Sequence, residues 1–202
     1  MKTVILTGGM GSGKSAVCAV LKARGVPVYD SDSRTKSLYD RDPALVGALE
    51  AALGTGLRAA DGRLDRAKLA SLIFQDPALK AAVEAIVHPA VLADVRRWKR
   101  WHRPKGWTYG PVPFVVLESA IILSCPVFDG VGDRTVLVDA SEEVRLARAV
   151  ARDGSAPEAV LRRIRQQRFD LSRVDAVISN DGSLEDLAAA ADRVFLNLFV
   201  SL

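Results

Sequence analysis

A glycine-rich segment near the start of the chain limits the possible folds more than any other feature of the sequence. The segment, Gly8-Gly9-Met10-Gly11-Ser12-Gly13-Lys14-Ser15, matches the pattern G-x-x-x-x-G-K-[ST] at every fixed position. It follows a β-branched apolar run, residues 3–7, and overlaps the start of residues 15–24, whose apolar positions have helical spacing. Backbone N–H groups of such a loop turn inward and the helix dipole adds positive potential, so the loop binds anions. The pattern therefore predicts a phosphate-binding loop between a buried strand and a helix.

Two side chains of this loop have a predicted role in nucleotide binding. Lys14 can reach the β- and γ-phosphates, and the Ser15 hydroxyl can ligate Mg²⁺. We therefore expect ATP and Mg²⁺ as cofactors. The residues expected to contact the nucleotide here are Gly9, Met10, Gly11, Ser12, Gly13, Lys14, Ser15 and Ala16.

Three more short apolar runs, at residues 114–117, 135–138 and 176–178, are typical of strands that are buried on both faces of a parallel sheet. Another strand is expected at residues 26–29, short or irregular because Pro27 cannot donate to a neighbouring strand. Helical patterns cover residues 142–152, 155–168 and 184 onward, and Ser155-Ala156-Pro157-Glu158 predicts a capping box. The expected fold class is α/β, a P-loop kinase with a five-stranded parallel sheet flanked by helices.

The segment between the second and third strands has a different character. Asp42-Pro43, Asp65 and Asp76-Pro77 have the form of helix N-caps, and no strand-like run lies between them. We expect a helical insertion over residues 33–111. The core is then formed by residues 1–32 and 112–202, with a small helical lid at about 145–170. Within the insertion, His88-Pro89 is expected to end one helix and to begin another.

The composition excludes several classes of protein. Apolar residues make up 49% and charged residues 26% of the 202 residues, so the chain can bury a core. No apolar run approaches the roughly 20 residues that a membrane span needs, and the chain becomes glycine-rich too early for a signal peptide. Cys18 and Cys125 are too few for a disulfide framework or a thiolate metal site. We expect a cytoplasmic protein with no membrane partner.

The positive charge is concentrated in one stretch. Six Lys and Arg residues and three tryptophans lie within residues 96–107, whereas the net charge of the whole chain is only +4. Basic residues interleaved with aromatic ones are typical of single-strand nucleic-acid sites. However, Val91, Val95 and Trp98 lie on one helical face, so Trp98 fits a core position in a solvated helix end. We favour the helix end over a nucleic-acid partner.

Two carboxylates follow the second predicted strand. Asp30 and Asp32 lie at its carboxyl end, beside the phosphate loop if the sheet is parallel, and ligands bind at that end of open α/β sheets. A carboxylate there can accept the proton of an acceptor hydroxyl or orient that hydroxyl. We favour Asp32 for this role. The alternative is an N-cap, provided by Asp32 or Ser31, for a helix that starts near Ser33.

A third acid, Glu118, closes the third predicted strand. Acids in this place often hold Mg²⁺ through water beside a phosphate loop. Any acid that ends a strand has the same appearance in the sequence, so both interpretations of Glu118 stay open.

Arginines gather on the two helices expected after the fourth strand. Those on the first are Arg145, Arg148 and Arg152, and those on the second are Arg162, Arg163 and Arg165. Guanidinium groups suit the spread charge of phosphates, so the two helices could form a mobile hairpin that closes over ATP. The alternative is a solvated face paired with Glu142, Glu143 and Asp153. We favour the functional role for Arg148.

The phosphate loop indicates a nucleotide but not a reaction. The chain has no guanine-reading Asn-Lys-x-Asp, and Asp129-Gly130-Val131-Gly132 is expected to be a turn because no apolar strand directly precedes it. The size of the chain argues against a motor. A small-molecule kinase remains, which must place an acceptor hydroxyl in line with the γ-phosphate and exclude water.

These segments resemble the dephospho-CoA kinase family over nearly the whole chain. Residues 6–15 are similar to its opening L-T-G-G-I-G-S-G-K-S, and residues 28–32 to its V-I-D-A-D. Residues 62–74 with His88-Pro89 resemble its CoA-binding helical domain, G-x-[LI]-[DN]-R…[LI]-[IV]-F…H-P. The lid pattern R-x-x-x-R-D is similar to residues 148–153, and D-x-V-I-x-N-x-G to residues 175–182.

The resemblance implies transfer of the ATP γ-phosphate to the ribose 3′-hydroxyl of dephospho-CoA, the last step of coenzyme A biosynthesis. The catalytic residues that it implies are Asp32, as base or orienting group, Lys14, and Arg148 of the lid. It places Asn180 and Gly182 near the adenine. The acceptor contacts that it implies are Asp32, Arg66, His88 and Glu118, and the metal contacts are Ser15 and Glu118.

The sequence departs from the family pattern in two places. Many members carry P-L-L-[FY]-E after the third strand, whereas residues 120–124 end in Ser124, so the task of the missing acid can fall to Glu118. Ala16 replaces a usual threonine, with a small expected effect because Ser15 keeps the metal hydroxyl. Two alternative functions stay open: another small P-loop kinase acting on a nucleotide or sugar hydroxyl, and a nucleotide-gated nucleic-acid-binding protein that uses residues 96–107.

Overall fold

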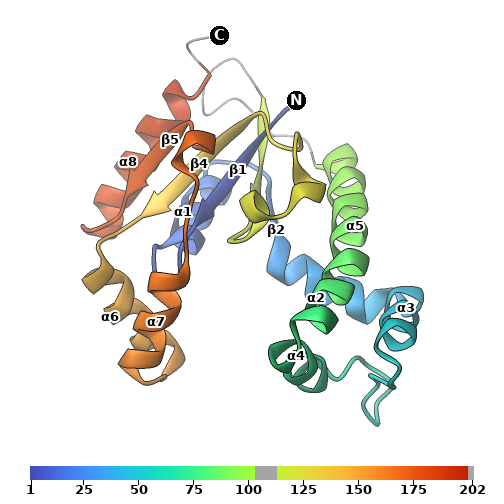
Figure 1. Ribbon diagram of the computed structural model, residues 1–202. Helices are drawn as coiled ribbons and strands as arrows, with labels where there is room; N and C mark the ends of the chain where they lie inside the picture. Colours follow the sequence, from blue (N-terminus) through green and yellow to red (C-terminus); the bar gives the residue numbers. More distant parts are fainter. Residues whose placement is uncertain (103–112, 200–202) are drawn as a thin grey trace. The chain divides into compact units, whose positions relative to one another are not determined.

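Figure 1 shows the computed structural model of the chain, which describes residues 1–102 and 113–199. These residues form two compact units: residues 1–29 with the chain from residue 101 onward, and residues 30–100. The first unit is built on a sheet. The second is built on helices, with one isolated bridge between Arg58 and Leu64. The expected domain limit at residues 111–112 lies outside the described residues.

The sheet of the first unit has five strands in the order β2-β3-β1-β4-β5. Their bounds are Lys2–Gly8 (β1), Val28–Asp30 (β2), Phe114–Glu118 (β3), Arg134–Asp139 (β4) and Ala176–Ser179 (β5). The central strand β1 pairs in parallel with both β3 and β4, so Ile5 lies opposite Leu117 and Thr135. Because inner strands of a parallel sheet are covered on both faces, β1, β3 and β4 are near-continuous buried runs, and the predicted five-stranded α/β fold is confirmed. The prediction that residues 176–178 are buried on both faces is wrong, since β5 lies at the edge of the sheet and its Val177 is 51% exposed.

The helices of the first unit come after its strands in the chain: α1 follows β1, α6 and α7 follow β4, and α8 follows β5. They are α1 (Lys14–Ala23), α6 (Glu142–Asp153), α7 (Pro157–Gln166) and α8 (Leu184–Asn197), with short 3₁₀ turns at Ile122–Ser124, Pro126–Phe128 and Leu171–Arg173. Apolar side chains of α1 and α8 pack with those of the sheet in one core. Within it, the Phe114 ring of β3 stacks on the Phe195 ring of α8 at a centroid distance of 5.6 Å. Asp129 and Gly130 lie in a turn, as expected.

The helical unit contains α2 (Ser31–Arg41), α3 (Pro43–Leu53), α4 (Arg66–Gln75) and α5, whose bounds are Pro77–Trp101. The three predicted aspartate caps are confirmed. Asp42 accepts from the N–H of Leu45 at 3.0 Å, Asp65 from that of Lys68 at 2.9 Å, and Asp76 from that of Ala78 at 2.7 Å. Each carboxylate satisfies an N–H group that has no partner inside its helix.

The prediction that His88-Pro89 separates two helices is wrong. Helix α5 runs without interruption from Pro77 to Trp101 with Pro89 inside it. A proline costs its helix one hydrogen bond and brings its ring against the preceding turn. Buried side chains recur on one face on both sides of Pro89, at Val83, Val87, Val91 and Val95. Their burial holds the two halves in one helix, so packing overrides the local preference.

The predicted capping box at Ser155 is also wrong, although the helix that it was meant to begin is present. Helix α7 starts at Pro157, its N-cap is Ala156, and no side chain caps it. Proline favours the first helical position, which leaves Ser155 one residue outside the cap. A capping box occurs instead at α8, between Ser183 and Asp186.

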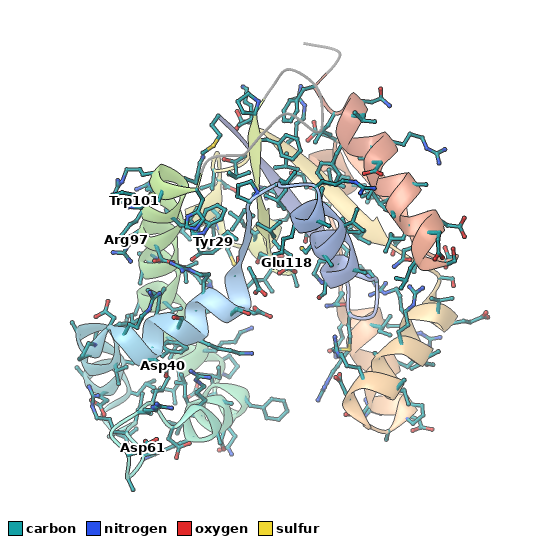
Figure 2. All side chains as sticks on the ribbon, turned by 180° about the vertical axis from the view of Figure 1, so that it is seen from behind. Tyr29, Asp40, Asp61, Arg97, Trp101 and Glu118 are labelled. Atoms are coloured by element: carbon teal, nitrogen blue, oxygen red, sulfur yellow. The ribbon has the colours of Figure 1, made fainter. Side chains whose placement is uncertain are left out.

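The basic stretch begins as the sequence predicts. Trp98 is buried with an exposed fraction of 7%, whereas Trp101, labelled in Figure 2, is 80% exposed. Arg97 forms an ion pair with Asp94. Residues 103–107 of the stretch lie outside the described residues. In the part of the chain that the structure describes, no helix combines the length and apolar character of a membrane span.

Candidate active site

The phosphate loop lies between the end of β1 and the start of α1, as predicted. Its last glycine, Gly13, is the N-cap of α1 and has a φ of 96°, a left-handed conformation that glycine adopts without strain. No side chain caps this helix. No side chain therefore occupies the N-terminus of α1, where the helix dipole adds positive potential that favours an anion. This local geometry fits the phosphates of a nucleotide.

Lys14 and Glu118 lie together beside the loop. The Lys14 ammonium donates to the carbonyl oxygen of Gly8 at 2.8 Å, and its distance to the Glu118 carboxylate is 4.0 Å. Both side chains are largely buried, with exposed fractions of 13% and 15%. The last residue of β3 thus places an acid next to the lysine that is expected to bind phosphate; Glu118 is labelled in Figure 2.

The residues predicted to hold Mg²⁺ have suitable oxygen atoms. Ser15 is exposed in the first turn of α1, and Glu118 ends the neighbouring strand β3. Among the described residues, no cluster of three or more His, Cys, Asp or Glu side chains forms a cage for a metal ion. The Ser15 hydroxyl and the Glu118 carboxylate suit Mg²⁺, because this ion keeps several waters and binds through one or two protein oxygens together with substrate phosphates.

Asn180 braces the phosphate loop from the end of β5. Its side-chain amide donates to the carbonyl oxygen of Ser12 at 2.7 Å, and only 4% of the residue is exposed. Its own N–H donates to the Asp139 carbonyl oxygen at 2.8 Å. The space beside Gly13 is filled by this amide, so a Cβ at Gly13 would collide with the Asn180 nitrogen. Asn180 therefore has a structural role that the sequence did not indicate.

The segment around Asn180 is fixed by hydrogen bonds on both sides. The N–H of Ser141 donates to Asp181 at 2.7 Å, and this bond is the main cause that lowers the pKa of Asp181. Gly182 packs against Asp186, whose carboxylate accepts from the N–H of Ser183 at 3.0 Å. A Cβ at Gly182 would lie 2.7 Å from that carboxylate. A side chain at Gly182 would therefore displace the carboxylate that completes the capping box of α8.

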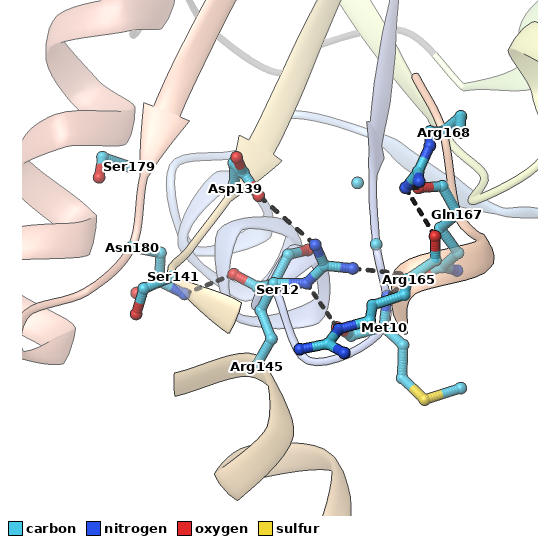
Figure 3. Close-up of polar contacts among 12 residues, drawn as sticks. Met10, Ser12, Asp139, Ser141, Arg145, Arg165, Gln167, Arg168, Ser179 and Asn180 are labelled. Carbon is cyan, nitrogen blue, oxygen red and sulfur yellow. Dashed lines mark hydrogen bonds and ion pairs between the residues drawn. The ribbon is translucent and has the colours of Figure 1, made fainter. Parts of the chain in front are cut away.

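Two arginines of α6 donate hydrogen bonds to different segments near the phosphate loop. Arg148, the favoured candidate, donates to the carbonyl oxygen of Asn180 at 2.8 Å. Arg145 reaches the phosphate loop itself, where it donates to the carbonyl oxygen of Met10 at 3.0 Å. Figure 3 shows the Arg145 guanidinium between Asp139 and Met10. Contact with the loop therefore comes from an arginine that the sequence did not single out.

Two other arginines of the predicted hairpin follow the alternative interpretation. Arg152 pairs with its neighbour Asp153 at 2.6 Å, and Arg165 pairs with Glu142 through two hydrogen bonds of 2.9 and 2.7 Å. The hydrogen bond from Arg165 is the main cause that lowers the pKa of Glu142. Both pairs are solvated; the Arg165–Glu142 pair joins α7 to α6, whereas the Arg152–Asp153 pair lies within α6.

The carboxylates after β2 are arranged differently from the prediction. Strand β2 ends at Asp30, and α2 begins at Ser31, so Asp32 lies in the first turn of a helix and not in the strand end. The N-cap is Asp30, which accepts from the N–H and hydroxyl of Ser33 at 2.9 Å each; the suggested caps Asp32 and Ser31 are wrong. Because the capping task belongs to Asp30, the exposed carboxylate of Asp32 is not needed for it.

The other two predicted acceptor residues belong to the helical unit, as Asp32 does. Arg66, at the start of α4, binds Asp40 of α2 at 2.8 Å and the carbonyl oxygen of Lys36 at 3.1 Å. His88 is half-buried near the middle of α5. Ser124, where the family pattern has an acid, ends the 3₁₀ turn after β3.

The sequence gives no sign of an ion cluster that forms around one buried carboxylate in this unit. Asp94 of α5 is fully buried, and Arg34 of α2 binds both of its carboxylate oxygens at 2.7 to 2.9 Å. Arg97 donates to the same carboxylate at 2.8 Å. Since Arg34 lies two residues after Asp32, this cluster fixes the helix that carries Asp32 on α5.

Three features together define a P-loop kinase. They are a parallel sheet with a phosphate loop after its central strand, a lysine beside that loop, and a helical insertion after β2. A family model described as dephospho-CoA kinase matches residues 2–186. The chain therefore belongs to the dephospho-CoA kinase family.

Individual relatives agree with this assignment. The dephospho-CoA kinase of Frankia casuarinae is 37% identical over 98% of this chain and 84% of its own length, and that of Porphyromonas gingivalis is 39% identical over 87% and 82%. The crystal structure of TT1252 from Thermus thermophilus aligns with a TM-score of 0.77 at 34% identity, covering 98% of this chain and 97% of that one. Dephospho-CoA kinase from Campylobacter jejuni shares the fold, with a TM-score of 0.67 at 17% identity over 98% of each chain.

Proposed function

We propose that this protein transfers the γ-phosphoryl group of ATP to the ribose 3′-hydroxyl of dephospho-CoA, giving coenzyme A and ADP. The observation that carries the proposal is the uncapped start of α1 behind the phosphate loop, with the Lys14 ammonium directly beside it. Membership of the dephospho-CoA kinase family supports the choice of acceptor.

In this proposal the loop amides and Lys14 bind the phosphates of ATP. Lys14 donates to a loop carbonyl oxygen in the structure, and phosphate oxygens are stronger acceptors for an ammonium group. The turn at Asn180 and Gly182 lies against the loop and is proposed to contact the adenine. Arg148 donates to Asn180, so its proposed role in the lid, at about 145–170, includes holding that turn.

Ser15 and Glu118 are the proposed protein contacts of Mg²⁺, Glu118 through water. When bound, the ion neutralises phosphate charge during transfer. Glu118 can take this place because it ends the strand next to β1 and lies near Lys14. Ser124, by contrast, has only a hydroxyl to offer where many family members have an acid.

The helical unit is the proposed binding region for dephospho-CoA, with Arg66 and His88 among its contacts. The Asp32 carboxylate is proposed to accept the proton of the 3′-hydroxyl or to orient that hydroxyl toward the γ-phosphate. Two features support this role: Asp32 is exposed, and Asp30 performs the capping of α2. The Arg34–Asp94 contact fixes the orientation of the helix on which Asp32 stands.

The role of Asp32 is tested by Asp32→Asn. We expect kcat to fall by about a hundredfold or more, because a positioned general base contributes roughly 10²–10⁴-fold, while the Kd for ATP stays nearly constant. Asp61→Asn is the matched control, since it neutralises another exposed carboxylate of the same unit. A kcat equal to that of the parent would remove Asp32 from the mechanism.

A further inference from the structure

Met10 joins the phosphate loop to the helix pair α6–α7. Its N–H donates to the side-chain oxygen of Gln167 at 2.8 Å, and its carbonyl oxygen accepts from the Arg145 guanidinium at 3.0 Å. The Met10 side chain packs against the small apolar core of the pair, which contains Ala149, Val160 and Ile164. Backbone and side chain of one loop residue are thus both attached to these helices.

Arg145 and Gln167 also bind each other. The second nitrogen of the guanidinium donates to the Gln167 oxygen at 3.0 Å, so that oxygen accepts from both Met10 and Arg145. Arg145 is only 13% exposed, and its remaining nitrogen lies 3.9 Å from the Asp139 carboxylate. Arg145 lies in the first half of α6 and Gln167 directly follows α7. The two ends of the helix pair therefore hold the two peptide groups on either side of Met10.

The glycines on either side of Met10 leave space that Arg145 fills. A Cβ at Gly9 would collide with the Arg145 guanidinium, and a Cβ at Gly11 would collide with the Arg145 backbone. The path of the loop therefore depends on where Arg145 lies. The direction of the loop N–H groups depends on that path, and those groups bind the phosphates.

We propose that Arg145 and Gln167 are positioning residues that act as one loop clamp. They fix the backbone of Met10, which keeps the neighbouring N–H groups directed at the nucleotide phosphates and couples the loop to the α6–α7 lid. The clamp rests on the proposed function in one respect, that the nucleotide is ATP. Neither residue needs to touch the substrate for this role, because both act through Met10.

The test measures ATP binding and turnover in Arg145→Gln, Arg145→Lys, Gln167→Leu and the double variant Arg145→Gln/Gln167→Leu. We expect the Kd for ATP, from calorimetric titration without acceptor, to rise roughly tenfold in Arg145→Gln, since hydrogen bonds to charged groups are worth about a factor of ten or more. The KM for ATP rises in parallel, while the KM for dephospho-CoA stays within about twofold. Lysine keeps the charge but not the forked geometry, so Arg145→Lys is expected to stay close to Arg145→Gln.

The double variant separates a clamp from two independent residues. If they act together, its Kd for ATP matches the worse single variant within about twofold; multiplied effects would overturn the proposal. An unchanged Kd in both single variants would overturn it as well. If Arg145→Gln fails to fold, Gln167→Leu carries the test, because it removes the shared acceptor and leaves the guanidinium in place.

Arg24→Gln is the matched control. It also removes one arginine of the first unit, but Arg24 pairs with Asp192 on the surface of α1 and α8. We expect its Kd for ATP to equal that of the parent. A variant that is merely destabilised has a lower thermal midpoint with an unchanged Kd, which would also contradict the clamp. ATP binding is measured without acceptor. If the parent enzyme phosphorylates a different acceptor, the proposed function is refuted, but the Kd values for ATP still test the clamp.

Discussion

Replacing Asn180 tests the contact between the phosphate loop and the end of β5. The Asn180 amide donates to the Ser12 carbonyl oxygen at 2.7 Å in a site where the residue is 4% exposed. Asn180→Ala leaves that carbonyl without this donor in a buried place, which costs about 1–3 kcal/mol. With about 2 kcal/mol as the central value, a chain of this size loses roughly 4–8 °C in thermal midpoint.

Asn180→Asp makes a sharper version of the same test. It replaces the N–H donor by a carboxylate oxygen that faces the Ser12 carbonyl oxygen, so the hydrogen bond becomes a repulsion between acceptors and a charge is buried. We therefore expect the free energy of unfolding to fall in the order parent, Asn180→Ala, Asn180→Asp. Because Ser12 belongs to the loop, ATP binding should weaken in the same order.

The assay is urea unfolding with a calorimetric measurement of the Kd for ATP. Asn197→Ala is the matched control: its side-chain amide also donates to a backbone carbonyl, that of Arg193 at 2.9 Å, but on the surface of α8. Exposed substitutions of this kind stay within about 0.5 kcal/mol. Equal losses in Asn180→Ala and Asn197→Ala would refute the reasoning, because they would show that burial of the Asn180 contact contributes nothing.

Three further predictions concern other parts of the molecule. Lys14→Ala abolishes turnover while the far-UV circular dichroism spectrum is kept, because it removes phosphate contact and little packing; turnover like that of the parent would refute this. Asp94→Asn lowers the free energy of unfolding, measured in urea, by about 3 kcal/mol. This is the lower end of the range for a broken buried ion pair, because Arg34 keeps access to water. A change below about 0.5 kcal/mol would contradict this prediction. Hydrogen bonds from the N–H and hydroxyl of Ser183 lower the pKa of Asp186, so its contribution to stability is full above the ordinary Asp pKa of about 3.9 and is lost as pH falls through its folded value. The stability gap between parent and Asp186→Ala should therefore shrink below about pH 4, and a pH-independent gap would exclude the lowered pKa.

Short-range features of the structure could be predicted from the sequence. The phosphate loop, the five strands and the caps at Asp42, Asp65 and Asp76 are each determined within a few neighbouring residues. The sequence does not locate the cap of α2, because all four residues from Asp30 to Ser33 are of types that cap helices. Only the point at which β2 ends selects Asp30.

Long-range features could not be predicted from one sequence. Arg145 meets Met10 across 135 residues and Gln167 across 22, so no local pattern distinguishes it from Arg148. Asp94 looks like a solvated helix residue next to Arg97, and its burial depends on Arg34, 60 residues away. The continuity of α5 through Pro89 has the same cause, since burial on one face outweighs a local helix-breaking preference.

The most direct measurement is ADP formation by the purified protein with ATP and dephospho-CoA, adenosine, AMP or shikimate as acceptor, with phosphorus NMR of the product. The account predicts ADP release that requires dephospho-CoA and a new phosphomonoester on the ribose 3′-oxygen. ADP release with another acceptor and none with dephospho-CoA, or a product phosphorylated at a different oxygen, would contradict it.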